Sequence, residues 1–150
     1  MGDLRDLYQE VILDHTKRPR NFGRLEMPSH RAEGHNPLCG DHLTLTLEIA
    51  DERVRKVLFE GAGCSISTAS ASLMTQMVKG KTTSETDELF KKFHEVVTSS
   101  IDANIDLAEL GKLAALAGVR KFPMRVKCAS LAWHTLQAAI QGDEDFVTTE

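Results

Sequence analysis

The sequence contains no hydrophobic run of the roughly 18 residues that a membrane-spanning helix requires. Its first residues also lack the apolar segment of a secretory signal peptide. Positive charge is not in excess either: the formal net charge is −4, whereas a nucleic-acid-binding domain usually presents a basic face. We therefore expect a cytoplasmic protein that binds neither membranes nor nucleic acid.

The motifs of several common enzyme classes are missing as well. The chain has no phosphate-binding Gly-x-x-x-x-Gly-Lys, no dinucleotide-binding Gly-x-Gly-x-x-Gly, no His-Glu-x-x-His and no Gly-x-Ser-x-Gly. The zinc-deaminase pattern fails too, because neither His-x-Glu nor Pro-Cys-x-x-Cys occurs.

Cysteine is scarce, with only Cys39, Cys64 and Cys128 among 150 residues. An odd number of cysteines in a reducing compartment argues against a disulfide framework and favours metal binding or thiol chemistry. A single free cysteine is, however, most often a small buried hydrophobic residue, so the surroundings of the three must decide.

The first half of the chain predicts one helix followed by a hairpin. Apolar residues at helical spacing mark the opening helix, which Pro19 and Gly23 end. Strict alternation of apolar and polar residues over 43–49 predicts a half-buried strand, and a turn at 51–53 leads to a second strand over 54–60. A further strand before Asn36 is only weakly signalled.

Helices dominate the second half of the chain. A glycine-rich turn at 61–64 leads into a helix of small residues that ends near Gly80. After a polar connection over 81–86, we expect helices at about 86–98, at about 105–117 with Gly118 as terminator, and from Pro123 to about 141. Residues 1–150 should form a single α+β domain: a small antiparallel sheet of about three strands with helices packed on one face.

All three cysteines fall near predicted boundaries between elements. Cys39 lies in the turn before the first clear strand, Cys64 lies in the glycine-rich turn, and Cys128 closely follows Pro123. Because a helix N-terminus carries partial positive charge, Cys64 and Cys128 are placed where thiolates are stabilised.

A carboxylate completes a candidate metal site. Asp41 is two residues beyond Cys39, and a tight turn at Gly40 would let both side chains face one point. Three thiolates and one carboxylate match the four tetrahedral ligands of zinc, and the nearby cations Arg125 and Lys127 would reduce the negative charge of such a site. No Cys-x-x-Cys pair is present, so spacing alone leaves metal binding and buried cysteines as equal alternatives.

The six histidines are weaker candidates. His42 should point to the strand face opposite Asp41, and His35, four residues before Cys39, could approach the site. The other four, which have no acidic or cysteine cluster near them in sequence, are predicted to be surface or capping residues: His15, His30, His94 and His134.

Four segments together resemble the U-type iron–sulfur cluster assembly proteins, and they span nearly the whole chain. They are the opening Leu7–His15 with Arg18–Asn21, His35–Asp41, Gly61–Ser67 and Arg125–Trp133. The resemblance implies an IscU-like and SufE-like fold and a role in iron–sulfur cluster assembly.

Within these proteins the chain is most similar to the SufU branch of zinc-dependent sulfurtransferases. IscU-type scaffolds have a histidine ligand immediately before the third cysteine, where this chain has Lys127, and the Leu-Pro-Pro-Val-Lys motif that docks a chaperone is absent. A lysine ammonium cannot donate a lone pair to iron. The resemblance therefore implies zinc bound by Cys39, Asp41, Cys64 and Cys128, and sulfur transfer from a SufS-type cysteine desulfurase to a downstream scaffold or other acceptor.

Three roles compete. The chain is a zinc sulfurtransferase, a scaffold that transiently holds an iron–sulfur cluster, or a protein with a purely structural zinc ion. Lys127 favours the first role over the second. The turn at Cys39 favours the first over the third, since its backbone freedom makes Cys39 the best candidate to leave the metal and accept sulfur.

Overall fold

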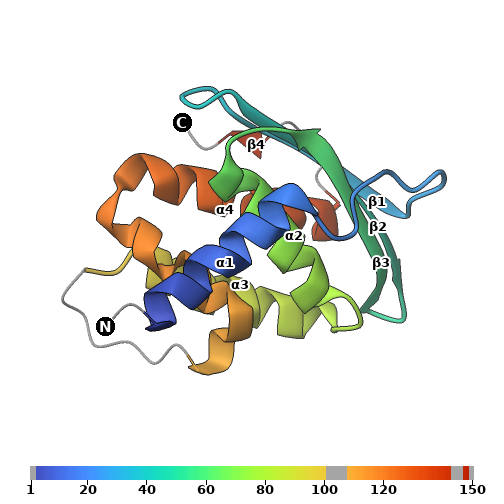
Figure 1. Ribbon diagram of the computed structural model, residues 1–150. Coiled ribbons are helices and arrows are strands. Elements are labelled where there is room, and N and C mark those ends of the chain that lie inside the picture. The colour runs from blue at the N-terminus through green and yellow to red at the C-terminus, as the bar shows by residue number, and fades with distance from the viewer. Residues whose placement is uncertain (1–2, 101–107, 143–146, 149–150) are drawn as a thin grey trace.

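The computed structural model describes residues 3–100, 108–142 and 147–148. Its elements follow the order α1 (Asp3–Lys17), β1 (His30–Asn36), β2 (Asp41–Ala50), β3 (Arg53–Ala62), α2 (Ser65–Val78), α3 (Thr83–Val97), the 3₁₀-helix η1 (Ala108–Lys121), α4 (Pro123–Ile140) and β4 (Val147–Thr148). Figure 1 shows a curved sheet with the helices gathered on one side of it. The predicted α+β arrangement is confirmed.

The sheet has the strand order β3-β2-β1-β4. The predicted hairpin is β2 and β3, and β1 pairs antiparallel with β2 so that Asn36 lies opposite Asp41. The weakly signalled strand is therefore real, although its sequence holds only one aliphatic residue, Ala32. The two-residue β4, which local sequence did not predict, pairs parallel to β1 at Gly34.

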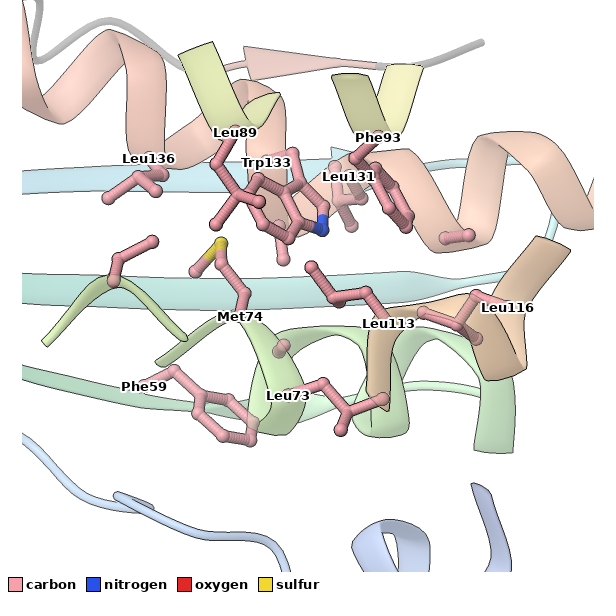
Figure 2. Close-up of a cluster of buried hydrophobic side chains, with 14 of the residues drawn as sticks. Phe59, Leu73, Met74, Leu89, Phe93, Leu113, Leu116, Leu131, Trp133 and Leu136 are labelled. Carbon is pink, nitrogen blue, oxygen red and sulfur yellow. The ribbon is translucent and has the colours of Figure 1, made fainter. Parts of the chain in front are cut away.

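The core lies between the sheet and the helices, with α4 at its centre. Figure 2 shows Trp133 of α4 among Leu89 and Phe93 of α3 and Met74 of α2. The rings of Phe93 and Trp133 stack with their centroids 4.8 Å apart, and Trp133 is fully buried. Substitutions that truncate such aromatic residues typically cost about 3–5 kcal/mol, so this cluster is a main source of stability.

Hydrogen bonds fix the position of α4 along α2. The indole N–H of Trp133 donates to Ser70 Oγ (3.2 Å), and the Ser70 hydroxyl donates to the carbonyl of Ala129 (2.6 Å). Because Ala129 follows Cys128, this chain of bonds sets where α4 presents that thiol beside α2.

Two predicted helix boundaries are wrong. The third long helix begins at Thr83 and not at 86, because Thr82 and Glu85 form a capping box at its start. The helix predicted for 105–117 is a 3₁₀-helix that continues through Gly118 to Lys121, and 105–107 lie outside the described residues. The glycine with positive φ is Gly111 (55°), so the kink falls there.

His15 is neither a surface nor a capping residue, as the sequence had suggested. Its side chain is buried between α1 and α2, with Nδ1 2.7 Å from Ser72 Oγ. A second bond joins the same helices, since the Thr16 hydroxyl donates to the carbonyl of Ser65 (3.2 Å). α1 is thereby fastened to the start of α2, the helix that follows Cys64.

No helix in the described part of the chain is both long and apolar enough to cross a membrane.

Candidate metal centre

Three separate parts of the fold supply the four predicted ligands. Cys39 lies in the turn between β1 and β2, and Asp41 is the first residue of β2. Cys64 is the N-cap of α2, and Cys128 lies in the second turn of α4. These parts meet at one end of the sheet, beside the start of α2.

The β1–β2 turn brings Cys39 and Asp41 to the same point. The Asn36 carbonyl accepts a hydrogen bond from the Cys39 N–H (3.3 Å), which closes a four-residue turn with Pro37 second, a position that proline favours. Gly40 follows with a φ of 74°, so the tight turn expected there is present. One ligand atom each from Cys39, Asp41 and Cys128 lie within 4.8 Å of one another.

Cys64 joins this cluster through Asp41. The backbone N–H of Cys64 donates to Asp41 Oδ1 (2.7 Å), and Cys64 Sγ lies 3.9 Å from Asp41 Oδ2. The same sulfur accepts the backbone N–H of Ser67 (3.5 Å) as the helix cap. Cys64 thus lies, as predicted, at the N-terminus of a helix.

Glycine is required at position 63 because the backbone there lies close to the Asp41 side chain. A Cβ atom there would lie 2.6 Å from Asp41 Oδ1, well inside van der Waals contact. The absence of a side chain lets the strand carrying Asp41 come close enough for the Cys64 N–H bond.

Cys128 departs from the prediction that each cysteine lies at a break between elements. It is buried inside α4, beyond the first turn in which the helix dipole acts. Burial raises the pKa of the Cys128 thiol, and hydrogen bonding with Asp41, Cys39 and Cys64 raises it further. Among this chain's own groups, Cys128 therefore favours the neutral thiol.

The group of Cys39, Asp41 and Cys128 fits a tetrahedral metal ion in chemistry and in size. Zinc–sulfur bonds of about 2.3 Å place two sulfur ligands about 3.8 Å apart, and here Cys128 Sγ lies 3.3 Å from Cys39 Sγ. The distance of 3.9 Å between Cys64 Sγ and Asp41 Oδ2 is also close to the sulfur–oxygen spacing of such a site. A divalent cation would offset the negative charge of four ionised groups held close together, two of which, Asp41 and Cys128, are buried.

Asn36 is a site residue that sequence reasoning missed. Its fully buried side-chain amide lies 3.4 Å from Asp41 Oδ2 and 3.6 Å from Cys128 Sγ. The alternation of side chains along a strand could have revealed it. Asn36 pairs with Asp41 across the turn, and paired residues point to the same face of a sheet. That pairing depended on β1, which the sequence indicated only weakly.

His35 does not approach the cluster. It pairs with His42 across β1 and β2, one residue out of phase with Asn36 and Asp41, so both histidines lie on the opposite face of the sheet. The prediction for His42 is confirmed, and the suggestion that His35 could approach is wrong.

The two cations lie on the segment that leads to Cys128. Arg125 is exposed, and its guanidinium lies 4.7 Å from the ring centroid of Phe122. Lys127 is half-buried immediately before Cys128. Three large apolar side chains on the ligand-bearing segments are also exposed by about half, namely Leu38, Phe122 and Met124. That the cations reduce the charge of the site stays a prediction.

Comparison with known proteins places the chain among iron–sulfur cluster assembly proteins. The family described as NifU-like N terminal domain matches residues 7–129. The zinc-dependent sulfurtransferase SufU of Bacillus subtilis is 43% identical over 144 residues, 95% of each chain. The iron–sulfur cluster assembly scaffold protein IscU of Streptococcus pyogenes is 41% identical over 94% of this chain and 87% of its own length. The crystal structure of FiSufU from Fervidobacterium islandicum AW-1 has a TM-score of 0.81 at 34% identity, covering 91% of this chain and 98% of that chain.

Proposed function

We propose that this chain, which belongs to the family of NifU-like N-terminal domains, is a zinc-dependent sulfurtransferase of iron–sulfur cluster assembly. Its sulfur donor would be a persulfide on a cysteine desulfurase of the SufS type, and its product would go to a downstream scaffold or other acceptor. The observation that carries the proposal is the close group of two thiols and one buried carboxylate formed by Cys39, Cys128 and Asp41, with Cys64 Sγ 3.9 Å from that carboxylate.

The residues that would hold zinc are Cys39, Asp41, Cys64 and Cys128. Bound zinc keeps cysteine sulfurs deprotonated at neutral pH, far below the ordinary thiol pKa of about 8.5. Burial raises the pKa of the Cys128 thiol, and a bound cation would oppose that shift. The relative named as a zinc-dependent sulfurtransferase supports the same choice of metal.

Cys39 is the ligand best placed to accept sulfur. It is exposed, whereas Cys128 is buried inside α4 and Cys64 is half-buried as the N-cap of α2. An N–H bond to sulfur further holds each of the other two, from Ser67 to Cys64 and from the Asn36 amide to Cys128, whereas Cys39 Sγ accepts a bond from the Cys128 thiol (3.3 Å). A donor persulfide approaching from solvent therefore reaches Cys39 first.

The transfer itself needs no outside oxidant or reductant. The Cys39 thiolate attacks the outer sulfur of the desulfurase persulfide and forms a new sulfur–sulfur bond. The old sulfur–sulfur bond breaks, and the desulfurase cysteine leaves as a thiolate. The outer sulfur and its proton pass to Cys39, so atoms, charge and electrons balance.

The test is mass spectrometry after the chain is mixed with desulfurase and cysteine. A persulfide adds about 32 Da per sulfur atom, and we expect this adduct on Cys39 in wild type. Cys39→Ala should keep its fold, lack the adduct and fail to stimulate the desulfurase, whereas Met27→Ala, a change at a highly exposed site, should behave as wild type. Normal stimulation by Cys39→Ala, with the adduct on another cysteine, would refute Cys39 as the acceptor.

A scaffold role is the second candidate, because a thiolate-rich cluster also suits iron and a close relative is named as an IscU scaffold. Against it stands Lys127 beside Cys128, where a scaffold's histidine ligand would be expected. Metal analysis and an absorption spectrum of chain purified without air separate the two. About one zinc per chain without visible absorbance supports the sulfurtransferase, and iron with visible charge-transfer bands supports the scaffold.

A further inference from the structure

Asn36 contacts three of the four proposed ligands, although it is not a ligand itself. Its side-chain Nδ2 lies 3.4 Å from Asp41 Oδ2 and 3.6 Å from Cys128 Sγ. Its backbone carbonyl accepts the N–H of Cys39 at 3.3 Å. One residue at the end of β1 therefore connects the turn, the first residue of β2 and the middle of α4.

The orientation of the amide follows from its neighbours. Nδ2 faces a carboxylate oxygen and a sulfur, both electron-rich, whereas a flipped amide would place Oδ1 against them. Among the described residues, Oδ1 has no hydrogen-bond partner and is buried. Burying such an oxygen without a partner is unfavourable, and an apolar side chain of similar size would avoid this cost. The Asn36 amide therefore contributes to the site through its N–H groups and not through its oxygen.

We infer that Asn36 is a positioning residue that holds Asp41 and Cys128 as the lasting ligands and so leaves Cys39 as the one that exchanges. An N–H bond to a metal-bound thiolate withdraws electron density from sulfur, which makes it less reactive and fixes its direction. Cys128 receives this bond, while Asn36 reaches Cys39 only through the backbone of the turn. The inference rests on the proposed function, because it concerns which cysteine is free to accept sulfur.

The experiment uses the zinc-loaded chain alone, without a desulfurase. Wild type, Asn36→Ala and Asn36→Asp are treated with limiting iodoacetamide, and the modified cysteines are mapped by mass spectrometry. Competition with a chromogenic chelator gives the zinc affinity. The matched control is Thr135→Val, which removes a fully buried hydroxyl on α4 that donates to the Leu131 carbonyl (2.7 Å), away from the cluster.

Wild type and Thr135→Val should be alkylated first at Cys39. In both Asn36 variants zinc affinity should fall about 10- to 100-fold, as is typical when a residue that supports metal ligands is removed. Cys128 should then be alkylated along with Cys39. Unchanged affinity and unchanged selectivity for Cys39 in both variants would overturn the inference.

A spectroscopic readout separates positioning from general loss of structure. With cobalt(II) in place of zinc, removal of the N–H bond should shift the sulfur-to-cobalt charge-transfer band, while Thr135→Val should not. Near-ultraviolet circular dichroism from the single tryptophan, Trp133, verifies that each variant is folded, and Asn36→Asp keeps the side-chain volume if Asn36→Ala does not fold. A folded Asn36→Asp protein with the wild-type cobalt spectrum would refute the positioning role.

The two hypotheses fail separately. If wild type takes no sulfur from a desulfurase but the Asn36 variants lose selectivity, the proposed function falls and the positioning role stands. If wild type takes sulfur on Cys39 and the variants keep their selectivity, only the role of Asn36 is lost.

Discussion

Asp41 is the residue on which the contacts of the candidate site converge. Its Oδ1 accepts the Cys64 N–H, and its Oδ2 lies within reach of the Asn36 amide and of Cys64 Sγ. The carboxylate is fully buried, so these groups replace part of the water that would otherwise solvate it, and a bound cation would add to them. A displacement of this one side chain should therefore disturb the whole ligand set.

Gly63→Ala tests that dependence. The new Cβ would lie 2.6 Å from Asp41 Oδ1, so the carboxylate must move away from the Cys64 N–H. We expect less zinc per chain and a loss of about 1–3 kcal/mol in the free energy of unfolding, as for other overpacked sites. Metal analysis and urea unfolding measure both. Gly118→Ala is the control, because a Cβ there meets nothing within 4 Å. Full zinc content and unchanged stability in Gly63→Ala would contradict the argument.

At this scale the proximity of Cys39 and Asp41 was easier to predict from the sequence than the surroundings of the candidate ligands. Cys39 and Asp41 are separated by one glycine, so local turn geometry was enough to bring them together. Asn36 depends on a cross-strand pairing, and the burial of Cys128 depends on how α4 is rotated against the sheet. Both are long-range consequences of packing, which spacing along the chain does not encode.

A second prediction at the residue scale concerns removal of the metal. Cys128 Sγ and Cys39 Sγ are 3.3 Å apart, so a movement of little more than an ångström brings them to disulfide distance. After chelation, hydrogen peroxide should oxidise the pair: two thiols lose two protons and two electrons, and the peroxide becomes water. Peptide mapping without reductant should find Cys39 joined to Cys128 and Cys64 unpaired. Cys64→Ser should keep this disulfide, and a dominant bridge from Cys64 would contradict the geometry.

At the scale of elements, α1 and α2 are held together by a buried polar contact between His15 and Ser72. The Ser72 hydroxyl accepts the backbone N–H of Arg20 (2.8 Å) and lies 2.7 Å from His15 Nδ1. Burial lowers the pKa of His15, the nearby Arg20 and Lys112 lower it further, and Asp14 opposes them. α1 is thus held to the helix that begins after Cys64 by an imidazole that favours its neutral form.

The buried contact of His15 predicts that the stability of the fold depends on pH. The folded state lowers the pKa of His15 below its ordinary 6.5. As the pH falls through about 6.5, the unfolded chain therefore binds more protons than the folded chain does. The free energy of unfolding should therefore decrease from pH 7.5 to pH 5.5, and the decrease should level off once the folded histidine also protonates. His134 contributes in the same direction, since burial and His94 lower its pKa too.

Urea unfolding of His15→Gln at both pH values provides the measurement. The variant should be less stable at pH 7.5 by about 1–3 kcal/mol, since it loses the buried bond to Ser72. It should also lose less stability than wild type on going to pH 5.5. His134→Gln should independently reduce the change in the free energy of unfolding with pH. A slope that neither substitution reduces would show that these histidines do not cause it.

At the scale of the whole molecule, elements with a strong local pattern were predicted and those defined by neighbours were not. The alternation of Leu43, Leu45 and Leu47 identified β2, and Pro123 identified the start of α4. β1 presents Ala32, Gly34 and Asn36 to the helix layer, so it lacks the apolar signal of a buried strand. β4 pairs with the edge of β1, and η1 is a 3₁₀-helix with a kink at Gly111; the local sequence signals neither feature.

The whole fold also determines how much stability the metal can add. Structural zinc contributes about 10 kcal/mol in small zinc-finger peptides, which have almost no core of their own. Here the segments that carry the ligands are already joined by the packing around Trp133 and by the bonds of Ser70 to Trp133 and Ala129. The metal would act as a cross-link between parts that are largely in place, so its removal should cost less than in those peptides.

Chelation should therefore lower the melting temperature while the chain remains folded. Far-ultraviolet circular dichroism should keep most of its helical signal, and the fluorescence of Trp133, the only tryptophan, should keep the emission of a buried indole. Adding zinc back in steps should restore the melting temperature in proportion to occupancy, because a ligand that binds only the folded state stabilises it by mass action. Asp41→Ala serves as the control, since a chain that lacks the buried carboxylate should bind zinc more weakly and respond less to chelator and metal. Complete unfolding of wild type on chelation, with red-shifted Trp133 emission, would mean that the core cannot hold the sheet and helices together without the ion.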